Sequence, residues 1–107
     1  MTQDLLTHLH NIVAARRTAD PETSYIAKLL RRGRAKIAQK IGEEGVETAL
    51  AAVSNDSKAI ISESADLLFH LAILWADAGI SPADIAAELA RREGQSGLAE
   101  KAQRPKE

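Results

Sequence analysis

Four acidic residues form two pairs, each with the spacing of about one helical turn. Glu44 and Glu47 are three positions apart, and so are Glu63 and Asp66, so on a helix each pair lies on one face. Carboxylates that crowd together repel and raise one another's pKa unless a cation neutralises them. If the pairs face each other, the pattern predicts a site for a hard divalent ion such as Mg²⁺, which prefers oxygen ligands.

A turn between the two pairs would bring them face to face. Residues 54–57 read Ser-Asn-Asp-Ser, and these residue types favour turns and cap the helix that follows. Glu47 and Glu63 each lie about two helical turns from this segment, so we expect the flanking helices to run antiparallel and the acids to meet. A solvated surface is the alternative, because Glu-x-x-Glu is common on exposed helices.

Basic residues precede the acids. Lys36 and Lys40 are one helical turn apart and could hold a phosphate chain that bridges to the metal. Lys28, Arg31 and Arg32 could line the entrance for such a chain, although a short amphipathic helix with a solvated basic end explains them equally well.

The hydrophobic spacing predicts an all-α domain of four to five helices, and no segment has a convincing strand pattern. Residues 1–93 would form this domain, and the polar tail 94–107 would be partly disordered. The expected helices are one capped by Thr2 and ending at Arg16 and Arg17, one starting at Asp20-Pro21 and ending at Gly33, and three more over about Arg34–Val53, Lys58–Ala78 and Pro82–Glu93.

The fourth expected helix is apolar nearly all round between Ala65 and Ala76. A helix of this kind must be covered on most sides, which a few short helices of one chain can hardly do. We therefore predict an antiparallel helical bundle that is completed by homodimerisation. Gly42 and Gly45 interrupt the preceding helix at a cost in stability, which suggests that another backbone or a ligand approaches closely there.

Composition excludes several classes of protein. The net charge is −1 with no basic stripe, so nucleic acid is not expected as a partner. The chain has no Cys, which removes disulfides and thiolate metal sites. The first residues lack the pattern of a signal peptide, and the apolar run from Leu67 to Trp75 is too short to span a bilayer. A soluble, cytoplasmic protein without a membrane partner is the expectation.

Three runs together resemble the phosphoribosyl-ATP pyrophosphatase family, one of the MazG-like all-α nucleotide pyrophosphohydrolases. They are Ala-Asp-Pro-Glu-Thr-Ser-Tyr at 19–25, Lys-Ile-Ala-Gln-Lys-Ile-Gly-Glu-Glu-Gly-Val-Glu-Thr-Ala at 36–49 and Glu-Ser-Ala-Asp-Leu-Leu-Phe-His-Leu at 63–71. The signature of these proteins is Glu-x-x-Glu followed by Glu-x-x-Asp.

The resemblance implies an enzyme of histidine biosynthesis that hydrolyses phosphoribosyl-ATP to phosphoribosyl-AMP and pyrophosphate. The family's catalytic metal ligands would correspond to Glu44, Glu47, Glu63 and Asp66, holding Mg²⁺ against the triphosphate. Phosphate oxygens would contact Lys36 and Lys40, with Lys28, Arg31 and Arg32 as further candidates. His70 and Glu43 would orient the ligands from outside the metal site.

Two other functions stay open on the sequence. One keeps the chemistry and changes the substrate to free non-standard nucleoside triphosphates, as in a housecleaning pyrophosphohydrolase. The other is a helical dimerisation module without enzymatic activity, whose acidic residues only decorate the surface.

Overall fold

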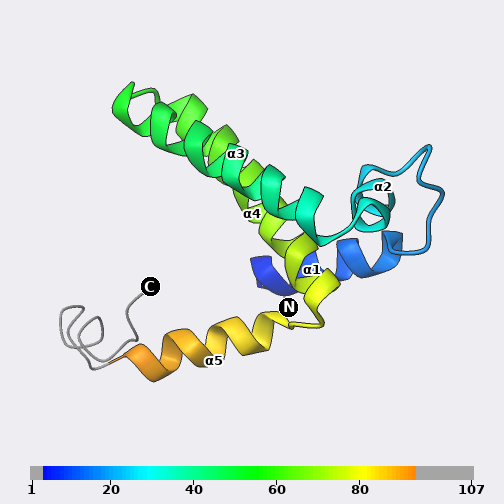
Figure 1. The fold of residues 1–107 in the computed structure, drawn as a ribbon. Helices are drawn as coiled ribbons and strands as arrows, with labels where there is room; N and C mark the ends of the chain where they lie inside the picture. Colours follow the sequence, from blue (N-terminus) through cyan, green and yellow to red (C-terminus); the bar gives the residue numbers. More distant parts are fainter. Residues whose placement is uncertain (1–3, 94–107) are drawn as a thin grey trace.

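The structure, a computed structural model, describes residues 4–93, which form five α-helices and no strand. The predicted tail 94–107 lies outside the described residues. The expectation of an all-α fold with four to five helices is confirmed (Figure 1). The helices are α1 (Leu5–Arg16), α2 (Tyr25–Arg32), α3 (Arg34–Val53), α4 (Ser57–Ala78) and α5 (Pro82–Arg92).

The first two helices begin later than the sequence suggested. Asp4 caps α1 by accepting the N–H of Thr7 at 2.9 Å, so the predicted cap at Thr2 is wrong. The predicted helix start at Asp20-Pro21 is also wrong, because the Asp20 carboxylate folds the next residues into a turn. The helix α2 begins only at Tyr25, after Ser24. In both helices the cap is the short polar residue directly before the first helical residue, namely Asp4 for α1 and Ser24 for α2.

The later boundaries agree with the sequence pattern. Asp56 caps α4 by accepting the N–H of Ala59, and Gly79 ends α4 in the left-handed conformation with φ 71°. Ser81 and Asp84 form a capping box at the start of α5, where Pro82 takes the first helical position. The predicted turn and helix starts around residues 54–57 and 81–82 are confirmed.

A single residue joins α2 to α3. Gly33 has φ 95°, a conformation that only glycine adopts readily. The chain can therefore end α2 and start α3 at once in a new direction. The basic side chains at the end of α2 consequently stay next to those at the start of α3.

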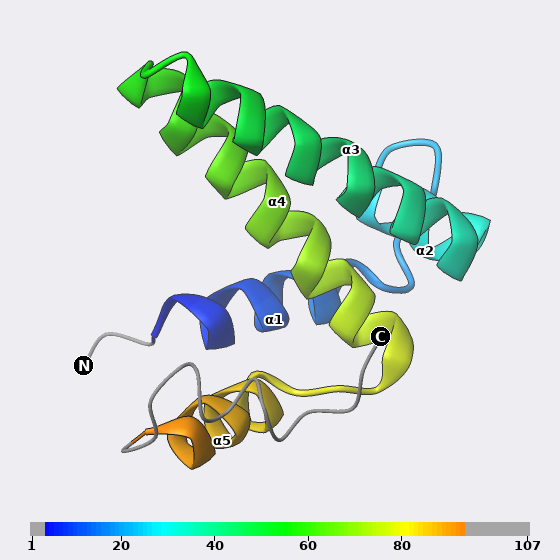
Figure 2. The same ribbon diagram turned by 60° about the vertical axis from the view of Figure 1, so that its left-hand side comes forward.

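The longest helices, α3 and α4, lie side by side as an antiparallel hairpin (Figure 2). The helices α1 and α2 pack against one half of it: α1 contacts α4, and α2 contacts α3 and α4. They also contact each other, and α5 packs against α1. Two arginines fasten the last turn of α4, because Arg17 donates to the carbonyl of Ala76 at 2.8 Å and Arg34 pairs with Asp77 at 2.6 Å. These cations satisfy carbonyl and carboxylate groups at a helix C-terminus.

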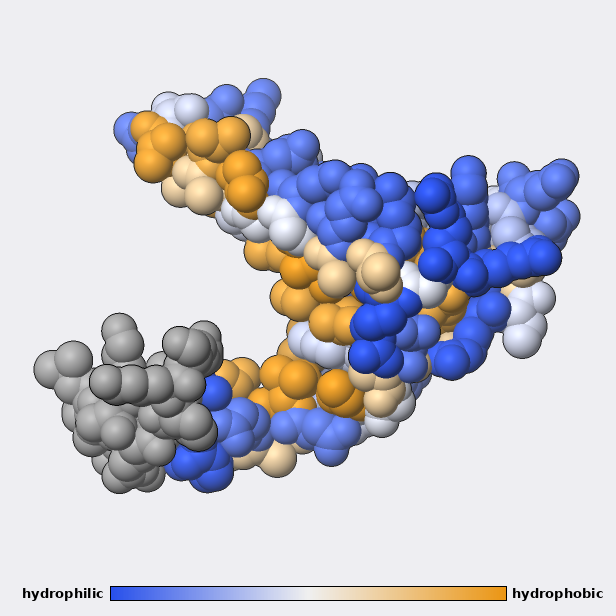
Figure 3. Space-filling view, in the orientation of Figure 1, coloured by the Kyte–Doolittle hydropathy of each residue, from blue (hydrophilic) through white to orange (hydrophobic). Residues whose placement is uncertain are grey.

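The core lies where α1, α2, α3 and the second half of α4 meet. Its buried members are Val13, Ile26, Leu29, Ile37, Ala72 and Ile73. The other end of the α3–α4 hairpin extends beyond this core, and apolar residues gather at its tip (Figure 3). There Leu50, Val53 and Ile61 are 59%, 82% and 70% exposed, so this end of the hairpin lacks cover within the described chain.

The expected close approach at the two glycines of α3 is not found in the described chain. Apart from the chain neighbours and the backbone of the same helix, a side-chain carbon placed on Gly42 or Gly45 would meet no atom within 4 Å. Another backbone of the same chain therefore does not explain these glycines, and the close approach of a second copy or of a ligand stays a prediction.

Among the described residues, α4 is the one helix long and apolar enough to cross a membrane by length and composition. The core helix of a soluble protein passes the same test. Here α4 packs against α1, α2 and α3, and 28% of its apolar window is buried inside the described chain.

Candidate active site

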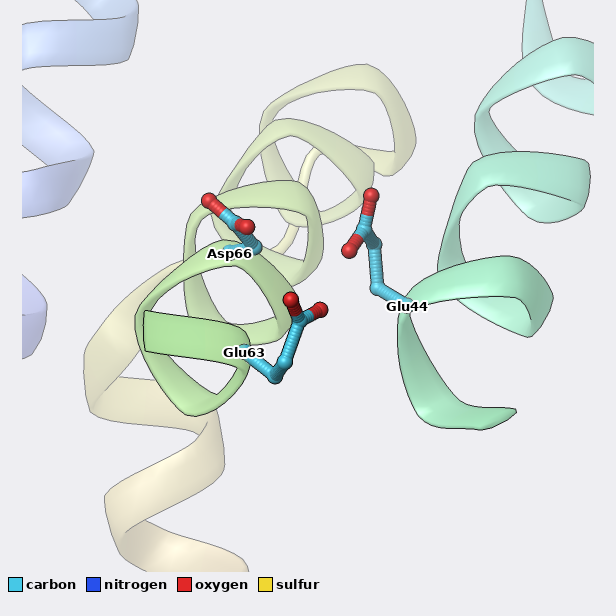
Figure 4. Close-up of side chains that lie close together, drawn as sticks. All are labelled: Glu44, Glu63 and Asp66. Atoms are coloured by element: carbon cyan, nitrogen blue, oxygen red, sulfur yellow. The ribbon is translucent and has the colours of Figure 1, made fainter. Parts of the chain in front are cut away.

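Three carboxylates converge between α3 and α4. Glu44 comes from α3, and Glu63 and Asp66 come from α4 (Figure 4). One oxygen from each lies within 4.8 Å of the other two, and the acidic side chains point toward one another across the two helices (Figure 4). Three hard oxygen donors at this spacing can hold one divalent cation. The predicted meeting of the Glu-x-x-Glu and Glu-x-x-Asp segments is confirmed for these three residues.

Two of the oxygens have no partner within the described chain. The Oε2 atoms of Glu44 and Glu63 are buried and accept no hydrogen bond there. An unpaired buried carboxylate oxygen is costly, so each needs a proton or a cation. A divalent ion such as Mg²⁺ fits this donor set, which consists of oxygens only.

Glu47 lies beside this group of three. Its carboxylate is close enough to raise the pKa of both Glu44 and Glu63, although its side chain is exposed. Together with Glu63 it lines an open depression of about 290 Å³ toward the tip of the hairpin. Glu47 thus borders the cluster on its solvent side and is not among the three acids whose oxygens lie within 4.8 Å of one another.

Burial and mutual repulsion disfavour the ionised site. Burial is the first cause that raises the pKa of Glu44, followed by Glu47 and Asp66, while His70 acts in the opposite direction. Burial, Glu47 and Asp66 likewise raise the pKa of Glu63. A bound cation would reverse this effect because it favours the charged carboxylates.

Thr48 fixes the two helices together at the site. Its hydroxyl donates to the carbonyl of Glu44, one turn earlier, at 2.7 Å, and lies 3.3 Å from the carbonyl of Glu63 on α4. One hydroxyl thus contacts the backbones of two of the three converging acids. This contact holds α3 and α4 in one position along their axes at the point where the carboxylates meet.

Four cationic side chains form a pocket next to the acids. The pocket has a volume of about 180 Å³ and is lined by Lys28 and Arg32 of α2, Lys36 and Lys40 of α3, and Tyr25 and Leu29. Hydrophilic residues gather over α2 and the adjoining end of α3 (Figure 3). A pocket with four positive charges favours a polyanion such as a phosphate chain.

Lys40 connects the basic pocket to the carboxylates. Its Nζ lies 3.3 Å from Glu43 Oε1 and 3.9 Å from Glu44 Oε1. The hydrogen bond to Glu43 is the first cause that raises the pKa of Lys40. A ligand in the pocket would therefore lie directly beside the candidate metal site.

His70 is buried behind the acids and is held at both ring nitrogens. Nδ1 lies 2.7 Å from the backbone carbonyl of Asp66, and Nε2 lies 2.7 Å from the Tyr25 hydroxyl. A carbonyl can only accept, so Nδ1 carries the proton, and in the neutral ring Nε2 accepts from Tyr25. His70 thus contacts the backbone of Asp66 rather than a ligand carboxylate.

Of the two remaining predicted residues, Arg31 lies apart from these groups and Glu43 contacts the basic pocket only through Lys40. Arg31 lines a different pocket, of about 330 Å³, with Arg17 and Asp77 among its walls. Glu43 is exposed, accepts from Gln39 at 2.9 Å and pairs with Lys40. The structure does not bring Arg31 together with the other cations.

The family of the chain follows from its similarity to known proteins. The model of the phosphoribosyl-ATP pyrophosphohydrolase family matches residues 6–93. The chain belongs to this family. It is 62% identical to the phosphoribosyl-ATP pyrophosphatase of Azospirillum brasilense over 91% of this chain and 87% of the relative. It is 59% identical to the protein of that name from Rhizorhabdus wittichii, over 94% of this chain and 95% of the relative. The protein of that name from Zymomonas mobilis is 54% identical over 99% of both chains. The family resemblance inferred from the sequence is confirmed.

The sequence pattern does not show how two further residues contribute to the site. Thr48 directly follows Glu47 in the third helix, and its side chain lies on the face toward α4. Tyr25 stands in the Thr-Ser-Tyr run, but its contact with His70 spans 45 positions of the chain. In the sequence, Tyr25 is recognisable only as an aromatic hydroxyl among basic residues. A surface helix can have the same combination, so the sequence does not mark Tyr25 as part of a site.

Proposed function

We propose that the chain hydrolyses phosphoribosyl-ATP to phosphoribosyl-AMP and pyrophosphate, the second step of histidine biosynthesis. In this family member, a carboxylate cluster with two unpaired oxygens lies beside a pocket of four cations. This placement is the observation that carries the proposal. One group of residues suits a divalent ion, and the adjoining group suits the triphosphate.

The reaction divides the work between the two groups. Lys36, Lys40, Lys28 and Arg32 neutralise and orient the triphosphate. Glu44, Glu47, Glu63 and Asp66 would hold Mg²⁺, and the bound ion would stabilise the negative charge that develops on the phosphoryl group. A water oxygen forms the new bond to phosphorus as the α–β bridging bond breaks, and pyrophosphate leaves. One of the four carboxylates accepts the proton of the water.

The substrate distinguishes this proposal from a housecleaning enzyme. We expect Mg²⁺-dependent pyrophosphate release from phosphoribosyl-ATP at a rate well above that from any free nucleoside triphosphate, tested side by side at equal concentrations. Pyrophosphate release from the same reaction mixture without enzyme provides the control. Faster turnover of a free, non-standard triphosphate would favour the housecleaning function instead.

We further propose that two copies of the chain form a homodimer that completes the helical bundle. Only three of the 22 residues of α4, namely His70, Ala72 and Ile73, are buried within one chain, which is few for a helix so apolar. The exposed apolar tip of the hairpin and the open space over Gly42 and Gly45 offer a surface for a second copy. Such a surface on a soluble protein is typical of an interface.

Light scattering tests the dimer. We expect twice the chain mass at micromolar concentration, and we expect Ile61→Lys to shift the protein toward the monomer because it buries a charge in the interface. Ser62→Lys is the matched control, since it adds the same charge to the neighbouring exposed position. A monomeric wild-type protein would contradict the proposal.

The proposal also implies a soluble enzyme of the cytoplasm that acts on a small molecule. The half-exposed apolar side chains of α4 would then face the second copy and not lipid. Recovery of the protein in the soluble fraction after cell lysis, without detergent, is the expected result.

A further inference from the structure

Tyr25 stands between two adjoining pockets. It lines the basic pocket, and with Lys28 it also lines a wider, open depression of about 700 Å³ formed by the loop residues Pro21, Glu22, Thr23 and Ser24. Because Tyr25 and Lys28 belong to both, the two pockets form neighbouring parts of one surface. The basic part leads on to the carboxylates through Lys40.

The ring of Tyr25 is held in place although much of it is exposed. Its hydroxyl bonds to His70 Nε2 at 2.7 Å, and its ring stacks on Phe69 with 6.2 Å between centroids and 24° between planes. The His70 ring meets it edge-on at 83°. The side chain nevertheless remains 47% exposed. An aromatic surface that is already fixed binds a flat ligand with little further loss of side-chain entropy.

The two pockets differ in charge. The basic pocket contains four cations and no acid, whereas the wider depression contains Glu22 and only one cation, Lys28. A phosphate chain therefore prefers the basic pocket. The part of the same ligand that carries no phosphate would then lie in the wider depression, next to the ring of Tyr25.

The base of the proposed substrate suits this second pocket. In phosphoribosyl-ATP the additional ribose is attached to N1 of adenine, and substitution at N1 makes adenine a stronger base that is protonated near neutral pH. A flat, cationic ring is attracted to an aromatic face and to a carboxylate. It would be repelled by the four cations of the neighbouring pocket.

We propose that Tyr25 is the platform on which the N1-substituted adenine ring of the substrate stacks, with Glu22 as its neighbouring negative charge. The proposal rests on the proposed function and assigns the nucleoside end of the same site. The triphosphate then extends past Lys28 into the basic pocket and on to the carboxylates.

Three ligands and two variants test this assignment. The ligands are 1-methyl-AMP, AMP and pyrophosphate, each with Mg²⁺ and measured by calorimetry. We expect Tyr25→Leu to weaken binding of 1-methyl-AMP by about tenfold or more, in line with the loss of base stacking on an aromatic ring. Pyrophosphate binding should change less than about twofold, because pyrophosphate uses only the cations and the metal. Tyr25→Phe keeps the ring and should retain most of the affinity for 1-methyl-AMP.

A second measurement uses the wild-type protein and does not depend on the folding of a variant. Tyr25 is the only tyrosine of the chain, so a ¹³C-labelled tyrosine ring reports on this site alone. We expect 1-methyl-AMP to shift its NMR signals through the ring current of the base and pyrophosphate to leave them nearly unchanged.

A third variant tests the charge beside the ring. Glu22→Gln should reduce the ratio of the affinity for 1-methyl-AMP to the affinity for AMP, because the carboxylate attracts only the cationic base. An unchanged ratio would remove Glu22 from the assignment.

The results separate this assignment from the proposed function. If Tyr25→Leu weakens 1-methyl-AMP and pyrophosphate equally, if Tyr25→Phe is as weak as Tyr25→Leu, or if the ring signals do not respond to 1-methyl-AMP, the stacking platform is refuted. The enzyme could then still turn over phosphoribosyl-ATP. If stacking is observed but phosphoribosyl-ATP is not hydrolysed, the platform stands and the proposed reaction fails.

Discussion

Glu44→Gln is expected to reduce turnover of phosphoribosyl-ATP by at least about 10³-fold, because it removes a charged ligand at the centre of the carboxylate cluster. Asp66→Asn should act similarly from the facing helix. The fold should survive in both variants, and the unfolding temperature should stay equal or rise, since one of several crowded negative charges is lost. Pyrophosphate release and thermal unfolding by circular dichroism measure the two effects.

Glu88→Gln provides the control for these variants. Glu88 lies on α5 and pairs with Arg91 at 2.7 Å and with Arg92 at 2.9 Å, away from the converging acids. Its loss should leave turnover within about twofold of wild type, as for most surface changes. If Glu44→Gln and Asp66→Asn kept wild-type turnover, the acids would be surface decoration and the chain a dimerisation module.

Removing divalent ions is expected to abolish turnover and also to make stability depend on pH in an unusual direction. The pKa values of Glu44 and Glu63 are raised above the ordinary 4.5 by burial and by neighbouring carboxylates. Between 4.5 and the raised values the folded protein binds more protons than the unfolded chain. The free energy of unfolding therefore falls as pH rises through this window.

The ion-paired carboxylate of Glu88 does not obscure the effect, because its pKa is lowered and not raised. Two arginines lower the pKa of Glu88 to about 2, so its contribution is gained between about pH 2 and 4.5 and is complete above that. Mg²⁺ binds only the ionised carboxylates, so it should raise the unfolding temperature at pH 7 and have little effect near pH 4.5.

Thermal unfolding across pH 4.5 to 7.5, in EDTA and in Mg²⁺, measures this dependence. Glu63→Gln should flatten the decline seen in EDTA and reduce the stabilisation by Mg²⁺. An EDTA profile that rises steadily through this window, unaffected by Mg²⁺, would count against a metal site between α3 and α4.

The convergence of the acids could be predicted because it depends on local rules. Helix periodicity places Glu63 and Asp66 on one face. The short turn capped by Asp56 folds α4 back along α3. Once the turn is fixed, the height at which Glu44 meets α4 follows from the rise per residue. The metal-site prediction needed no knowledge of the rest of the fold.

The surroundings of the acids could not be predicted because they depend on how α2 docks. Arg31 and Arg32 are neighbours in sequence, but consecutive residues point about 100° apart on a helix. Only Arg32 faces the pocket with Lys36, and Arg31 faces Asp77 and Arg17 instead. Which of the two enters the site depends on the rotation of α2 against α3, and periodicity within α2 does not specify that rotation.

The one-residue joint at Gly33 limits how this enzyme can vary in length. Lys28 and Arg32 reach the pocket from one side of the joint, and Lys36 and Lys40 reach it from the other. An added residue at the joint would rotate the two walls against each other and divide the four positive charges between two surfaces. Insertions between Arg32 and Arg34 should therefore be rejected.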